Sequence, residues 1–446
     1  MSENNGTAPS DAMGLRGILR TLRYRNYRLF FGGQGVSLIG TWMQRIAMSW
    51  LVYRLTNSVF LLGIVGFFGL LPTFLIAPVA GVFADRWNRR RILVVTQCLS
   101  MLQASILALL VLAGTVRVWH IIVLSVFLGF VNAFDVPARQ SFVPDMIEKR
   151  EDLGNAIALN SAMFHGARLL GPSIAGIIIA AVGEGMCFLL NAISYLGVIA
   201  ALLAMRVAHG DARGKDTNVL QGLKEGFGYA LGFAPIRALL LLGGLVSLVG
   251  MPYTILAPFF AKDILHGGPH TLGYLMAASG AGSLVGAVYL ASRKSLLGLG
   301  RIIALTSSVF GIGLMGFSLS HVMWLSLLFM LLTGFGMMVQ MASSNTILQT
   351  IVDDDKRGRV MSFYTMAFMG MAPFGSLLAG SLASKIGAPN TLLIGGVCCI
   401  LGSLLFRRKL PVLQKMTRPI YVKRGILPEV ALGIQSTSEL TRSPEA

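Results

Sequence analysis

The sequence predicts an all-α membrane protein of about twelve transmembrane helices in two similar six-helix bundles, with both termini cytoplasmic. Apolar runs of about 20 residues, basic clusters between alternate runs and an internal repeat predict this fold. The chain of 446 residues is 54% hydrophobic and 13% charged, and its mean hydropathy is +0.71. A soluble protein of this length needs a more polar surface, whereas lipid allows an apolar one.

The apolar runs locate the spans, because about 20 helical residues cross the hydrocarbon core. The expected spans are 28–53, 58–83, 92–113, 118–138, 157–181, 185–205, 236–260, 271–292, 301–319, 322–341, 360–384 and 388–406. The expected domains are an N-terminal cytoplasmic segment (1–27), a first bundle (28–205), a linker (206–235), a second bundle (236–406) and a basic cytoplasmic tail (407–446). Residues 220–231 fit either an amphipathic surface helix or a plain linker.

Basic residues indicate the orientation. Most of the 37 Lys and Arg residues lie in loops expected on one side, and the positive-inside rule makes that side cytoplasmic. The net charge of +18 therefore reflects membrane topology, and no aromatic-interleaved basic domain indicates nucleic-acid binding. The N-terminal segment has no signal-peptide pattern, so we expect the first span to direct insertion.

The two halves repeat each other at an offset of about 204 residues. Residues 171–176 (GPSIAG) fall on 375–380 (GSLLAG), and Gly183 falls on Gly387. A parallel repeat of six spans predicts two bundles related by an axis along the membrane normal, with a substrate path between them.

The composition argues against other kinds of site. The four cysteines lie within apolar runs and suit core packing, so we expect no metal site and no cofactor. Hydrolase, zinc-protease and nucleotide-binding motifs are missing from the sequence, so an enzyme or an ATP-driven pump is not expected. A receptor or assembly factor without transport remains an alternative.

The loop between the second and third spans carries an acid and several bases at close spacing, in Gly81, Asp85, Arg86, Asn88, Arg89 and Arg90. It resembles the signature loop of the major facilitator superfamily, with Asn88 where glycine is usual. The resemblance implies a breakable ion-pair cluster that gates the movement of the bundles. A cytoplasmic anchor would explain the arginines but not Asp85.

The fifth span contains a Gly-Pro step among small residues, at Ala167, Gly171, Pro172, Ala175 and Gly176. This pattern is similar to the fifth-span motif of the superfamily's antiporters, with alanine at two usual glycine positions, and it implies export. A simple helix-packing seam is the alternative.

Two further stretches, 40–45 (GTWMQR) and 132–140 (NAFDVPARQ), resemble the branch of enterobactin exporters and macrolide efflux proteins. The resemblance covers about residues 20–408. It implies a multi-pass protein of the bacterial inner membrane that expels bulky, partly apolar molecules in exchange for protons. We expect a monomer, because the internal repeat already supplies both halves of the path. Uncoupled transport and import remain alternatives.

Polar residues inside spans are candidates for the transport path, because burying them in a membrane is costly. Arg45 and Arg168 are the expected cations, and with few acids nearby they favour an anionic substrate unless carbonyls or other helices pair them. Asp135 and His165 are the candidates for proton coupling, although a lone histidine in a membrane helix is more often a packed polar residue. Further path candidates are Gln34, Asn132, Asn191 and Gln340.

Overall fold

The computed structural model describes residues 20–206, 228–293, 295–353 and 356–424, and all of their regular secondary structure is helical. Within helices, the side chains of 77–79, 81–86, 150, 357–359 and 423 are outside the description. Parts of three expected segments also lie outside the described residues: 1–19 of the N-terminal segment, 207–227 of the linker with most of its possible surface helix, and 425–446 of the tail.

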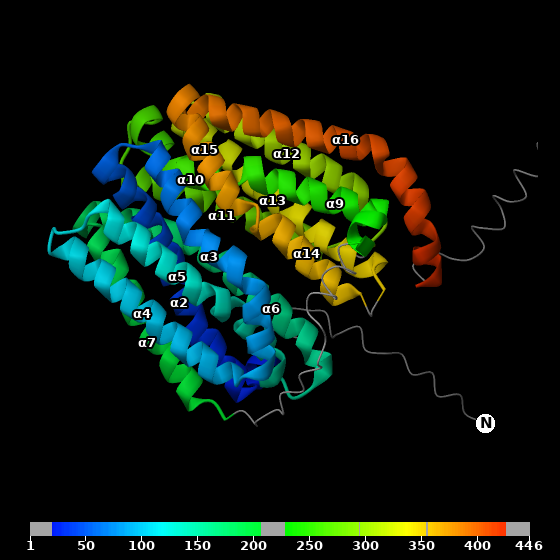
Figure 1. Ribbon diagram of the computed structural model, residues 1–446, viewed down its shortest axis with the longest axis horizontal. Helices are drawn as coiled ribbons and strands as arrows, with labels where there is room; N and C mark the ends of the chain where they lie inside the picture. Colours follow the sequence, from blue (N-terminus) through cyan, green and yellow to red (C-terminus); the bar gives the residue numbers. More distant parts are fainter. Residues whose placement is uncertain (1–19, 207–227, 294, 354–355, 425–446) are drawn as a thin grey trace, which may run out of the picture.

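The N-terminal half contains six long helices, which follow the six apolar runs expected there (Figure 1). Their bounds are α2 Arg25–Thr56, α3 Val59–Arg86, α4 Arg89–Leu112, α5 Val118–Phe142, α6 Leu153–Val182 and α7 Glu184–Ala204. Short 3-10 turns precede α2 (η2, Arg20–Arg23) and lie between α5 and α6 (η3, Pro144–Met146; η4, Arg150–Asp152).

The C-terminal half repeats this arrangement with two interrupted spans. Its elements are α9 Ala234–Leu245, η5 Val246–Gly250, α10 Tyr253–Phe259, η6 Phe260–Ile264, α11 Pro269–Ala291, α12 Leu299–Leu319, α13 Met323–Ile351, α14 Arg357–Met369, α15 Ala372–Ile386 and α16 Ala388–Lys423. The segments η5 and η6 are single π-helical turns, so the seventh expected span is a helix with two bulges. The eleventh is broken between α14 and α15.

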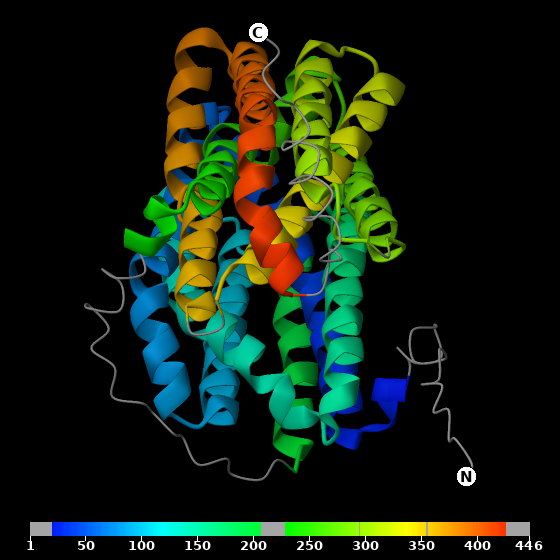
Figure 2. The ribbon, with the colours of Figure 1, turned by 90° about the vertical axis from the view of Figure 1, so that its right-hand side faces the viewer.

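The internal repeat extends to helix packing. In the N-terminal half α3 packs on α5, and α4 packs on α5 and α7; in the C-terminal half α11 packs on α13, and α12 packs on α13 and α16. Gly183 and Gly387, which the offset of 204 aligns, both have φ of 86°, and each separates the fifth span of its half from the sixth. A side chain at either position would be strained there. Figures 1 and 2 show the halves as two adjacent groups of helices.

Eleven helical segments of the described chain are long and apolar enough to cross a membrane. They include the interrupted spans Ala234–Ile264 and Val360–Ile386. The remaining long helix, α2, has 32 residues and packs against α6 and α7, but it is more polar and carries Arg45 along its length. The multi-pass helical fold is therefore confirmed, and the count of twelve depends on α2.

The last helix is longer than the expected twelfth span. We expected the bundle to end near residue 406, whereas α16 continues to Lys423 and contains Pro411 and Pro419. Leu410 and Leu413 bury their side chains against the C-terminal bundle, which stabilises the extension. The first part of the expected tail is therefore an amphipathic helix with exposed basic residues.

Two seams join the halves: α6 against α11, and α3 against α15. Both rest on glycine pairs. A Cβ on Gly176 would lie 3.2 Å from Cα of Gly273, and a Cβ on Gly63 would lie 2.8 Å from Cα of Gly380. Gly176 and Gly380 are equivalent under the offset of 204, so the two seams are related by the internal repeat.

The seams bring the halves together mainly at one end. We call the end at which α4 and α12 begin the basic end. At the opposite end, Lys262 donates to Asn57 at 2.6 Å, and Tyr53 donates a short hydrogen bond to Asp263. Toward the basic end the pairing changes: α14 packs mainly on α9 and α13, within its own half.

Candidate functional site

Trp42 lies between two arginines in the N-terminal half. The guanidinium carbons of Arg45 and Arg168 lie 4.8 Å and 5.6 Å from the centre of its ring, which are cation–π distances. Arg45 follows Trp42 by about one turn of α2, whereas Arg168 comes from α6. Gly171 allows this approach, because a Cβ there would lie 2.5 Å from the Cβ of Trp42.

Neither arginine has a carboxylate within ion-pair distance among the described residues. Arg168 is only 6% exposed, and its Nε has no hydrogen-bond partner. The two guanidinium groups repel each other electrostatically. The site therefore holds two neighbouring positive charges without a compensating acid, an arrangement that is costly in a low-dielectric environment.

Arg45 is exposed although it lies near the middle of α2. Met48, one turn further along, accepts a hydrogen bond from Ser125 of α5 at 3.5 Å, so this face of α2 points toward another helix of the bundle. Arg45 therefore lies on a side of α2 that faces another helix of the bundle.

Arg168 also contacts the other half. Its Nη2 donates to the hydroxyl of Tyr253 on α10 at 3.2 Å and lies 3.9 Å from the sulfur of Met337 on α13. The Tyr253 hydroxyl is in turn 2.8 Å from that of Ser279 on α11. One buried cation thereby connects the N-terminal half to three helices of the C-terminal half.

His165 lies one turn before Arg168 and is 9% exposed. Its Nδ1 has no hydrogen-bond partner. Phe164 packs edge-on against both His165 and Trp42, with ring centres 5.6 Å and 5.7 Å apart. The structure therefore places this coupling candidate next to the arginine pair.

Asp135 lies elsewhere in the same half, in a fully hydrogen-bonded position. Arg139, four residues along α5, forms an ion pair with it at 2.6 Å. Thr96 and Gln97 of α4 donate to its other oxygen at 2.9 Å and 2.8 Å. The carboxylate is 3% exposed, so its partners inside the bundle satisfy its hydrogen-bonding capacity.

Asn191, another path candidate, lies inside the bundle. It is 0% exposed and donates to Gln44 at 2.7 Å, and Gln44 donates to Gln103 at 2.9 Å. This chain of amides joins α7, α2 and α4, so its evident role is to hold three helices together.

The other path candidates are dispersed. Gln34 is buried in α2 and Asn132 is half-buried in α5, one turn before Asp135. Gln340 is 1% exposed in α13; its amide nitrogen donates to Ser344 at 3.5 Å, and its oxygen has no partner.

The described part of the loop between α3 and α4 holds the N-terminal half together. Asn88 caps α4 by accepting from the Arg91 amide at 3.1 Å. Arg89 pairs with Asp145 at 3.0 Å, and Arg90 donates to the carbonyls of Leu202 and Leu203 at 2.7 Å each. The side chains of Gly81, Asp85 and Arg86, the rest of the expected gate, lie outside the described residues.

The small residues of the fifth span lie at helix contacts. Gly171 packs on α2, and Gly176 packs on α11 at a seam. Ala167 and Ala175 are buried, and the carbonyl of Pro172 would lie 2.8 Å from a Cβ on Gly273. The motif therefore occupies a seam between the halves, which fits both the packing interpretation and a movable contact.

The sequence reasoning missed several contacts of the candidate site and of the closed end. Trp42 belonged to a recognised stretch but received no role, and Tyr253 received none. Arg139 could have been found, because an acid and a base at i and i+4 meet on one helix face. The pairing of Lys262 with Asn57 had no signal in the sequence, because the partners lie 205 residues apart.

A further polar cluster lies at the basic end. Tyr24 donates to Asp152 at 2.6 Å, and Arg20 and Arg23 pair with it at 3.2 Å and 3.4 Å. The hydrogen bond from Tyr24, together with the nearby charge of Arg20, holds the pKa of Asp152 below its ordinary value.

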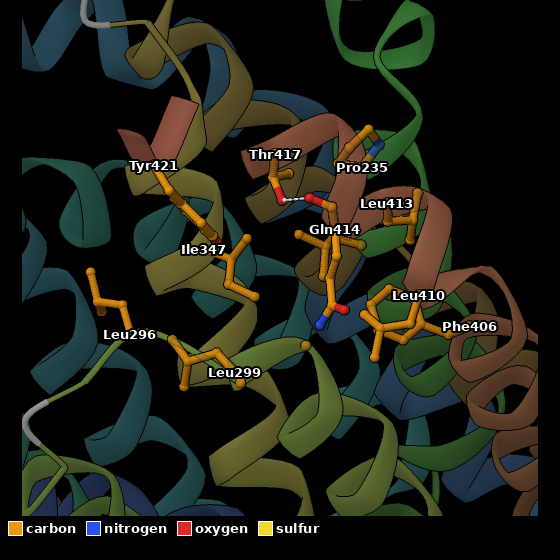
Figure 3. A pocket seen from close by; sticks show the side chains of 13 residues that line it. Pro235, Leu296, Leu299, Ile347, Phe406, Leu410, Leu413, Gln414, Thr417 and Tyr421 are labelled. Carbon is orange, nitrogen blue, oxygen red and sulfur yellow. Dashed lines mark hydrogen bonds between the residues drawn. The ribbon is translucent and has the colours of Figure 1, made fainter. Parts of the chain in front are cut away.

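A cavity of about 60 Å³ lies in the C-terminal half under the extension of α16 (Figure 3). Its lining is mostly apolar and comes from α9, α12, α13 and α16, including Leu299, Ile347 and Leu410. Gln414, Thr417 and Tyr421 are its lining residues with polar side-chain atoms. The cavity is separate from the arginine pair and contains no charged lining residue.

Comparison with known proteins identifies the family to which the chain belongs. The family model described as "transmembrane secretion effector" matches residues 17–433. The staphyloferrin A transporter of Staphylococcus aureus is 28% identical over 85% of this chain and 95% of its own length. Macrolide efflux protein A of Streptococcus pyogenes is 25% identical over the same shares. The multidrug efflux pump Tap of Mycobacterium tuberculosis is 27% identical over 86% of this chain and 91% of its own length.

Solved structures support the fold. A bacterial homologue of the lysosomal transporter Spinster, in an inward-facing and unoccupied conformation, superposes with a TM-score of 0.69 at 13% identity and covers 89% of this chain and 98% of its own. A peptide transporter superposes with a TM-score of 0.71 at 12% identity over 88% and 95% of the two chains.

Proposed function

Since the chain belongs to the transmembrane secretion effector family of the major facilitator superfamily, we propose that it is a secondary active exporter of bulky amphipathic molecules. On this proposal α2 is the first of twelve spans, both termini are cytoplasmic and the basic end faces the cytoplasm. Family membership makes the chain a membrane transporter rather than an enzyme.

The observation that carries the proposal is the pair of repeat-related seams. Because α6–α11 and α3–α15 join two similarly packed halves mainly at the end away from the basic clusters, the halves can rock about these seams. The structure then corresponds to an inward-facing state. Breaking the contacts of Tyr53 and Lys262 while closing the basic end would produce the outward-facing state.

The relatives support export and the size of the cargo. Their names specify a siderophore transporter, a macrolide efflux protein and a multidrug efflux pump. We therefore expect a siderophore-like molecule or a hydrophobic drug as cargo and a protein located in the bacterial plasma membrane. The working unit is a monomer, since the repeat supplies both halves of the path.

Proton exchange is the proposed energy source, and Asp135 is its proposed carrier. A proton on Asp135 would remove the charge that holds Arg139 and release its contacts with α4. Proton binding would thereby loosen a contact inside the N-terminal half. His165 is the second candidate because it packs against Phe164, which in turn packs against Trp42.

The test is proton movement in energised inside-out vesicles, read with an internal pH-sensitive dye. Adding a catecholate siderophore, and separately a lipophilic drug, should raise the internal pH through antiport. Asp135→Asn should abolish the response. Glu184→Gln removes an acid that pairs with Arg54 at 2.7 Å beyond the candidate path, and it should retain the response.

Uncoupled transport is the second candidate, and the existing ion pair of Asp135 with Arg139 favours it. A carboxylate that never releases Arg139 carries no proton. Cargo movement without any change in the dye signal, in protein-containing vesicles, would establish this alternative.

A further inference from the structure

We propose that the space beside Trp42, Arg45 and Arg168 binds an anionic group of the cargo, a carboxylate or phenolate attached to an aromatic body. This inference rests on the proposed function and specifies the substrate class of the same path. It requires the arginines to lack another counter-charge and the geometry to suit an aromatic anion.

The charge balance supplies the first requirement. Arg45 and Arg168 repel each other and have no acid within ion-pair distance in the described chain. The nearest candidate in the same half, Asp135, already accepts from Arg139, Thr96 and Gln97. A bound anion would therefore remove an existing repulsion as well as form new bonds.

Both arginines also have N–H groups that make no hydrogen bond in the described chain. The Nε of Arg168 is buried without a partner, in a side chain that is 94% buried. The guanidinium of Arg45 makes no hydrogen bond among the described residues, and the residue is exposed. Both groups therefore retain donors for a carboxylate, which an arginine can bind through two parallel hydrogen bonds.

The surrounding rings specify the body of the ligand. Trp42 and Phe164 pack edge-on at 5.7 Å, and Phe164 is 43% exposed. These rings present apolar surface next to the two cations. An aromatic acid can therefore stack on them while its charge reaches the guanidinium groups.

Binding would also reach the C-terminal half. Arg168 donates one hydrogen bond to the hydroxyl of Tyr253, which belongs to α10. An anion that draws Arg168 toward Arg45 competes with this bond and weakens a contact between the halves. Cargo recognition and rocking would then share one side chain.

The test compares charge variants of one aromatic probe on the purified full-length protein in detergent. Isothermal titration calorimetry would measure the Kd values of 2-naphthoate and of its neutral analogue 2-naphthamide. We expect the acid to bind at least tenfold more tightly, and Arg45→Gln or Arg168→Gln to bring the ratio close to one. Arg301 is an exposed arginine at the start of α12, so Arg301→Gln serves as the matched control and should preserve the wild-type ratio of the two Kd values.

The proposal is overturned if wild-type protein binds the acid no more tightly than the amide, including the case in which neither binds. It is also overturned if the preference survives the double substitution. The wild-type comparison needs no variant, so it remains decisive where a substitution prevents folding. Binding is read without a proton gradient, so failure of antiport leaves this result unchanged, and export without anion preference overturns only this inference.

Discussion

The two halves share their packing but differ in what they bury. Among the described residues, the buried charged side chains lie in the N-terminal half: Asp135, Asp152, Arg168 and Glu184, joined by His165. The buried polar side chains of the C-terminal half are serines, threonines and Gln340. In the described chain, the N-terminal half therefore buries charged side chains, which are costly to place in a membrane, while the C-terminal half contributes buried hydroxyl groups and close glycine contacts.

This difference indicates a division of labour. The N-terminal half holds the buried carboxylate of Asp135, and the amides of Gln44 and Asn191, in short side-chain networks. The C-terminal half needs surfaces on which helices approach closely, as at Gly334, whose added Cβ would lie 1.8 Å from the carbonyl oxygen of Ser279.

The largest expected effect comes from joining the halves at their closed end. The test places cysteines at both positions, Asn57→Cys with Lys262→Cys, in a chain lacking the four native cysteines. A short bifunctional thiol reagent should bridge them, because Nζ of Lys262 lies 2.6 Å from Oδ1 of Asn57 in the native chain. Bridging should abolish export and leave the basic end accessible to a thiol-specific label. Full transport by the bridged protein would contradict the rocking of two units.

The next effect tests the charge difference directly. Arg168→Gln should lower the initial export rate in vesicles at least tenfold, a loss of about 1.4 kcal/mol, because it removes a cation from the path. Ser343→Ala deletes a buried hydroxyl of the C-terminal half that has no hydrogen-bond partner, and its rate should stay within about twofold. Equal losses in both variants would remove the functional asymmetry.

A smaller effect concerns the close packing of the C-terminal half. Gly334→Ala should cost about 1–3 kcal/mol of unfolding free energy, because the new methyl group meets backbone that cannot move aside. Gly166→Ala in α6 has open space around its Cβ and should be neutral or slightly stabilising. Melting temperatures in detergent check both, and matching values would show that this glycine contact is not constrained.

The smallest effect is the pH dependence of Asp152. Its folded-state pKa lies below the ordinary value of 3.8, so its stabilisation is present above that pH and is lost as the pH falls through the folded pKa. Because Arg20 and Arg23 are about half exposed, we expect a contribution of at most about 1 kcal/mol at pH 7. The melting difference between wild type and Asp152→Asn should shrink between pH 5 and pH 3; a constant difference would contradict the assignment.

The sequence predicted the spans because apolar runs report lipid exposure directly. It did not predict the breaks at Val246–Gly250 and between α14 and α15, because hydropathy does not record which backbone groups bond to each other. The extension of α16 was missed for a related reason: Leu410 and Leu413 form an apolar stripe too narrow to count as a span.

The candidate site was predictable in part. Arg45 and Arg168 stood out because charges are rare within spans. Their convergence on Trp42 depends on how α2 and α6 cross at Gly171, which only a structure gives. The roles assigned to Asp135, His165 and the described part of the gate remain predictions.

No acid of the described chain pairs with Arg45 or Arg168, and this has an electrical consequence. A membrane potential of 100 mV is worth about 2.3 kcal/mol for each elementary charge that crosses it. If the cargo is an anion that neutralises this pair, an inside-negative potential favours outward movement of the cargo and the return of the empty, positively charged site toward the cytoplasm. The voltage across the membrane would then help to drive the cycle, whether or not a proton travels the other way.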